Sequence, residues 1–162
     1  MDRLVQNQRE LRSECEMEQP VQGVSAQSQI EFRGETDDAM VAQMVAEVIA
    51  AKCAWVLQLD VMIKHDERDE PREILRLIRL EELKHVELLR GLALPSTGEP
   101  SAWENHEGVI GYNRAAQLKL KSSEFVRRIY YSFTDTPTRD ILFEIICDDT
   151  NNAIRFTLLA MG

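Results

Sequence analysis

A charged pair inside an apolar helical stripe constrains this chain more than any other feature. Glu82 and His85 lie three residues apart, so one stands above the other on one face of a helix. A carboxylate and an imidazole that face a core must be paired, ligated or neutralised, because burying a bare charge costs much free energy. Helical bundles use an inward Glu-x-x-His to hold a carboxylate-bridged metal pair, although a hydrogen-bonded core pair without metal also fits. The stripe that contains the pair, within the stretch 71–92, consists of Leu75, Ile78, Leu89 and Leu92.

The composition favours one soluble helical domain. The chain has 162 residues, of which 44% are hydrophobic and only 6% aromatic, with few glycines and prolines. Its net charge of -9 argues against nucleic-acid binding and against binding to anionic membranes. The longest uninterrupted apolar run is too short for a membrane span, and the N-terminus lacks the apolar core of a signal peptide. The three cysteines are scattered, without the spacing of a zinc site or disulfide framework, so we expect a cytoplasmic protein.

Four long helices are expected after a polar arm. Residues 1–36 are polar and glutamine-rich, and we expect them to form a flexible arm that a protein partner can order. Two short turns and one longer middle connection separate the helices of the remaining domain, 37–162. This pattern predicts an all-α four-helix bundle. The predicted helices span residues 37–65, 71–92, 109–133 and 137–160.

The second and fourth predicted helices resemble each other at an offset of 67 residues. The segment 72–75 reads Arg-Glu-Ile-Leu, and the segment 139–142 reads Arg-Asp-Ile-Leu. At the same offset Glu82 falls on Asp149, and His85 falls on Asn152. Both helices therefore carry a polar interruption at the same depth of an apolar stripe.

These residues resemble the ferritin-like superfamily, with rubrerythrins and bacterioferritins as the nearest members. The resemblance covers residues 37–161 and is carried by Glu47 in the first helix, LEELKH at 80–85 and CDDTNN at 147–152. It implies a bundle of two helix hairpins, each giving one Glu from its first helix and Glu-x-x-His from its second. It further implies metals, iron or manganese, that react with dioxygen or peroxide, and a homo-oligomer such as a dimer. The implied metal ligands are Glu47, Glu82, His85 and Asp149.

The second half-site departs from the family pattern. Asp149 has a shorter reach than Glu, Asn152 is a poor ligand for a transition metal, and Arg114 stands where the repeat would place a carboxylate. Three inward carboxylates carry a formal charge of about -3, which one divalent ion reduces to about -1. We therefore expect at most one metal, with Arg114 near the place of the second. Without metal, the carboxylates must be protonated or paired with Arg114 or Lys52, and Asp149 could serve as ligand or as ion-pair partner.

Two functions follow from this sequence. The first is a ferritin-like metal-binding protein with oxidoreductase or metal-handling activity, which would need an external electron donor. The second is a degenerate, non-catalytic ferritin-like bundle that serves as a binding or assembly module.

Overall fold

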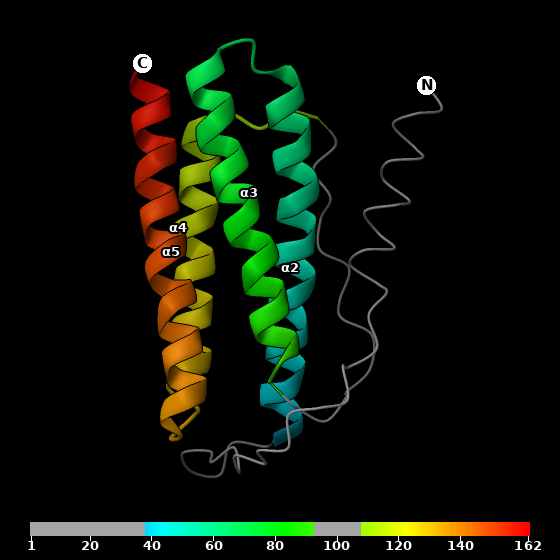
Figure 1. The fold of residues 1–162 in the computed structure, drawn as a ribbon. Coiled ribbons are helices and arrows are strands. Elements are labelled where there is room, and N and C mark those ends of the chain that lie inside the picture. The colour runs from blue at the N-terminus through cyan, green and yellow to red at the C-terminus, as the bar shows by residue number, and fades with distance from the viewer. Residues whose placement is uncertain (1–37, 93–107) are drawn as a thin grey trace, which may run out of the picture.

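Four α-helices lie side by side in the computed structural model, which describes residues 38–92 and 108–162 (Figure 1). No strand occurs within those two ranges, so the predicted all-α helical bundle is confirmed. The predicted arm, 1–36, and the predicted linker, 94–100, lie outside the described residues. The helices are α2 (Asp38–His65), α3 (Asp69–Arg90), α4 (Tyr112–Tyr130) and α5 (Thr136–Met161).

The helix ends follow from local chemistry. Helix α3 begins two residues earlier than predicted, because Pro71 is tolerated in a first turn, where backbone N–H groups have no intrahelical partner. Helix α4 begins three residues later than predicted, directly after Gly111, whose backbone is extended and so stands outside the helix. Helix α5 starts after Asp135, whose side chain accepts a hydrogen bond from the backbone N–H of Thr138 at 3.0 Å.

Consecutive helices form the closest pairs. Helix α2 packs along α3, and α4 packs along α5, while contacts of α3 with α5 and of α2 with α4 join the two pairs. Short turns link the members of each pair, which therefore run antiparallel. In Figure 1, α3 ends at the lower end of the bundle and α4 begins at the upper end, so these two helices run in the same direction.

The core is divided into two apolar clusters by a layer of buried polar side chains. One cluster lies toward the C-terminal end of α3 and includes Val45, Leu89, Val126 and Ile145. The other lies toward its N-terminal end and includes Leu59, Leu75, Ala115 and Phe156. Each of the four helices contributes at least one side chain to the layer between the two clusters. The layer consists of six fully buried residues: Lys52, Glu82, His85, Lys119, Asp149 and Asn152.

The inward face of α4 is turned by about one residue from the one that helical periodicity predicts. The predicted inward stripe of the segment 109–133 consists of Ala115, Leu118, Ser122, Phe125, Ile129 and Phe133. Ala115, Ile129 and Phe133 are buried as expected. Between them, however, the fully buried positions are Lys119, Ser123 and Val126. The predicted Leu118, Ser122 and Phe125 are only half-buried. The rotation brings a lysine into the core at the depth of the polar layer.

Helix α2 is apolar enough and long enough to cross a membrane, by length and composition alone, because an 18-residue window within Ala39–His65 has a mean hydropathy of 1.6. The statement made from the sequence concerns uninterrupted apolar runs, which polar residues such as Glu47 and Lys52 break in this helix. The finding is weak evidence for a membrane, because the core helix of a soluble bundle passes the same test. Lys52, in the middle of this helix, pairs with an aspartate of α5, as expected of a helix in a bundle core.

Candidate functional site

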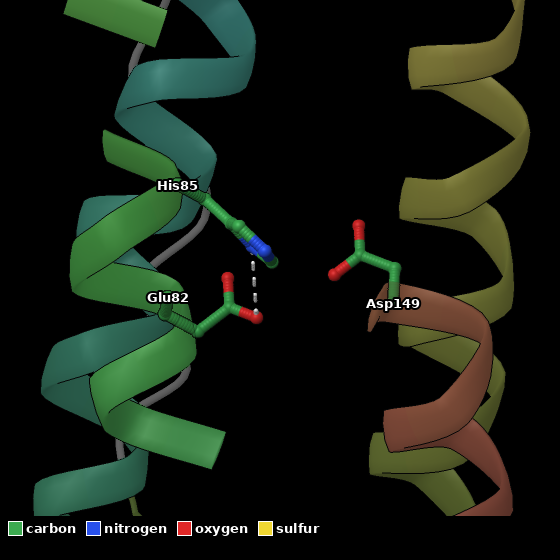
Figure 2. A group of neighbouring side chains, drawn as sticks. All are labelled: Glu82, His85 and Asp149. Carbon is green, nitrogen blue, oxygen red and sulfur yellow. Dashed lines mark ion pairs between the residues drawn. The ribbon is translucent and has the colours of Figure 1, made fainter. Parts of the chain in front are cut away.

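Three side chains from two helices meet in the polar layer. Glu82 and His85 point from α3 toward Asp149 on α5 (Figure 2). Each residue offers one potential ligand atom, and these atoms lie within 4.8 Å of one another. All three side chains are fully buried. The sequence predicts that Glu47, Glu82, His85, Asp149 and Asn152 converge at one depth of the core, and the structure bears this out for all of them except Glu47.

Lys52 on α2 neutralises both carboxylates. Its ammonium group donates hydrogen bonds to both oxygens of Asp149, at 2.7 and 2.8 Å. The same nitrogen lies 3.3 Å from Oε2 of Glu82. Burial alone lowers the pKa of Lys52, but the charges of Glu82 and Asp149 outweigh it and raise the pKa above its ordinary value. Lys52 is thus a fixed cation, and neither a general base nor a nucleophile at neutral pH.

Lys119 on α4 makes the matching contacts from the other side. Its ammonium group donates a hydrogen bond to Oε1 of Glu82 and another, at 3.2 Å, to Oδ1 of Asp149. The ammonium also stands 4.7 Å from the centre of the Trp55 ring, a cation–π contact on the apolar side of the layer. Each lysine therefore bridges the same two carboxylates.

The four charges of this quartet, Lys52, Lys119, Glu82 and Asp149, cancel. Burial by itself raises the pKa of Asp149, but the charges of Lys119 and Lys52, with hydrogen bonds from Lys52 and Ser122, hold it well below the ordinary range. Asp149 is consequently ionised at neutral pH. Two cations and two anions leave the dry core with no net charge, so no metal ion is needed to balance it.

The ring of His85 is oriented as in metal-ligating histidines, although the charge balance of the quartet requires no metal ion. Its Nε2 lies 3.0 Å from an oxygen of Asp148, and its Nδ1 faces Glu82 Oε1 at 4.0 Å without a hydrogen-bond partner in the described part of the chain. Burial, reinforced by the charge of Lys52, lowers the pKa of His85, so the ring is neutral at pH 7. A neutral ring that donates Nε2–H to Asp148 keeps the Nδ1 lone pair directed at the cluster, as metal-ligating histidines do.

The contacts of the layer follow the internal repeat. Adding 67 to Lys52 gives Lys119, just as adding 67 to Glu82 gives Asp149. Shifting by the repeat offset thus turns the Lys52–Asp149 pair into the equivalent of the Lys119–Glu82 pair. Each of these ion pairs connects the α2–α3 helix pair to the α4–α5 helix pair. The two halves of the chain contribute equivalent charges to one shared centre.

The remaining predicted residues lie elsewhere or play smaller parts. Glu47 is half-buried, accepts a long hydrogen bond from Gln43 at 3.4 Å, and is not among the grouped ligand atoms. Arg114 is exposed, so the prediction that it stands at the place of a second metal is wrong. Asn152 is fully buried, and its Oδ1 accepts a hydrogen bond from Arg155 at 2.7 Å.

The role of Lys119 was not predicted from the sequence. Lys52 and Glu47 are five residues apart on α2 and point about 140° away from each other, so Lys52 does not neutralise Glu47. The conditional expectation that carboxylates without metal pair with a lysine matches the observed Lys52 contacts. The repeat offset of 67, applied to Lys52 as it was to Glu47, would have located Lys119.

Comparison of the chain with protein-family models, with curated proteins and with solved structures finds no match. Any family relationship therefore rests on the residues and the geometry described above.

Proposed function

We propose that this chain is a ferritin-like four-helix bundle in which two lysine side chains take the electrostatic place of metal ions. On this proposal it works without metal, as a binding or assembly module and not as an oxidoreductase. The observation that carries the proposal is the pairing of Lys52 and Lys119 with both Glu82 and Asp149. The ferritin-like part is supported by Glu-x-x-His on α3, by its counterpart on α5 and by parallel α3 and α4, which a single crossover connection produces.

Energetics favour the metal-free state. A divalent ion added to the neutral quartet would leave two excess positive charges in the core unless both lysines lost their protons. Deprotonating even an ordinary lysine at pH 7 costs about 5 kcal/mol. The raised pKa of Lys52 increases that cost for this residue.

A second candidate function is a protein that binds one metal, and the unpartnered Nδ1 of His85 favours it. Glu82, His85 and Asp149 supply two carboxylate oxygens and one imidazole nitrogen, a donor set suited to iron or manganese. The residues fit such an ion by type but not by charge while both lysines remain protonated. We therefore place this function second.

Metal content separates the two functions. The protein is purified from cells supplied with iron and manganese, and bound metals are measured by inductively coupled plasma mass spectrometry. We expect far less than one ion per chain, and oxygen consumption on addition of Fe²⁺ that is no faster than in buffer without protein. One or two ions per chain that survive gel filtration, or oxygen consumption faster than that of Fe²⁺ in buffer alone, would overturn the proposal.

A further inference from the structure

The two buried lysines do more than balance charge. We infer that Lys52 and Lys119 hold closed a latent site for one divalent cation formed by Glu82, His85 and Asp149. The inference rests on the proposed metal-free function and assigns these lysines as the residues that determine it. The single fact behind it is that both ammonium groups bridge the two carboxylates that would otherwise serve as metal ligands.

The positions of the lysine nitrogens support this role. Lys52 Nζ lies 2.7 and 2.8 Å from the oxygens of Asp149 and 3.3 Å from Glu82 Oε2. Lys119 Nζ contacts the opposite oxygen of Glu82 and also reaches Asp149. A cation bound by these carboxylates would need the same oxygens, so the ammonium groups and a metal ion compete for one set of ligand atoms.

The ligand geometry is close to what a metal requires. Oxygen and nitrogen ligands bind zinc-sized ions at about 2.0–2.2 Å, so two ligand atoms of one ion lie at most about 4.4 Å apart. The ligand atoms of Glu82, His85 and Asp149 lie within 4.8 Å of one another, so a contraction of a few tenths of an ångström would suffice. The contact of His85 Nε2 with Asp148, at 3.0 Å, already orients the ring for ligation through Nδ1.

Charge fixes the number of ions. When a metal ion takes the place of both lysines, Glu82 and Asp149 bind it as carboxylates and His85 binds it as a neutral imidazole, so the ligands carry two negative charges. One divalent cation cancels that charge, whereas a second would leave a dry core with two excess positive charges. The opened site should therefore hold one ion.

The test is the double variant Lys52→Met/Lys119→Met, because methionine keeps an unbranched apolar side chain of similar length. Co²⁺ is the probe, followed by its visible absorption, by calorimetric titration and by the thermal unfolding midpoint. We expect one Co²⁺ per chain, with an unfolding midpoint that rises with Co²⁺ concentration. The matched control is Lys64→Met/Lys121→Met, which removes exposed lysines from the same two helices and should bind no more Co²⁺ than the wild type.

Two further variants make the outcome decisive. Adding Asp148→Asn to the double variant removes the carboxylate that orients His85, and should weaken Co²⁺ binding by about 10–100-fold. The variant Lys52→Met/Lys119→Met/Glu82→Gln/Asp149→Asn has no charges in the layer and should fold without binding Co²⁺. It shows whether the helices tolerate the two methionines.

The outcomes distinguish this inference from the proposed function. Metal in the wild-type protein would overturn both. A wild type without metal, together with a double variant that folds but gives no cobalt absorption or thermal shift, overturns only the latent site. A double variant that stays unfolded even with Co²⁺, while the uncharged variant folds, also overturns it, as does equal binding by the Lys64→Met/Lys121→Met control.

Discussion

Replacing Lys52 by methionine should destabilise the bundle strongly, because it leaves the buried quartet with an uncompensated negative charge. Lys52 and its carboxylate partners have at most 1% of their side-chain surface exposed, and the lysine contacts both oxygens of Asp149. Breaking a buried pair by removing one partner costs about 3–5 kcal/mol. For a chain of this size, that corresponds to a fall in the unfolding midpoint of roughly 6–20 °C.

The same reasoning predicts that a second substitution partly restores stability. Asp149→Asn alone leaves an excess positive charge and should cost a similar amount, but Lys52→Met/Asp149→Asn removes one charge of each sign. The remaining Lys119–Glu82 pair is then balanced. The double variant should therefore be more stable than the sum of the single effects predicts, by about 2–3 kcal/mol. Urea denaturation of the wild type, the two single variants and the double variant measures this coupling at pH 7.

An exposed pair provides the control. Lys84 on α3 pairs with Glu144 on α5, and their side chains are 52% and 43% exposed. Because solvent screens such pairs, Lys84→Met/Glu144→Gln should show a coupling of about 0–1 kcal/mol. If the coupling of Lys52 with Asp149 were no larger than that of the exposed pair, the buried quartet would not have the energetic role assigned to it.

Three other predictions follow. Burial, with the charge of Lys52, lowers the pKa of His85, so the unfolded chain binds a proton more readily than the folded chain does. The free energy of unfolding should therefore fall as the pH drops below about 6.5. Urea titrations should show a weaker pH dependence for His85→Gln. A hydrogen bond from Arg68, aided by one from Tyr112, lowers the pKa of Asp66 to about 2. The stabilisation that the ionised Asp66 gives the fold is present above its unfolded pKa and is lost as the pH falls toward 2. Asp66→Asn should therefore lower the unfolding midpoint at pH 7 but hardly change it near pH 2. We also expect a dimer or larger assembly. Helix α5 exposes three large apolar side chains that a second copy of the chain would cover: Phe143, Ile154 and Leu158. A monomer mass by light scattering at micromolar concentrations would contradict this expectation.

Much of the fold could be predicted from local sequence. Helical periodicity and turn residues located four helices to within three residues at each described end, because these patterns reflect burial and backbone chemistry that act locally. The burial of Glu82 and His85 followed from their apolar stripe. The placement of Asp149 and Asn152 at the same depth followed from the repeat.

What the sequence could not decide was which faces of α2 and α4 turn inward. Helix α2 is apolar around most of its circumference, so periodicity does not distinguish the face of Glu47 from that of Lys52, about 140° away. The structure buries Lys52 and, by a small rotation of α4, Lys119. Packing against the other helices selects those faces, since the two fully buried carboxylates on α3 and α5 need cations beside them. The sequence by itself therefore determined the helices and the depth of the polar layer, and only the tertiary structure decided which charges complete it.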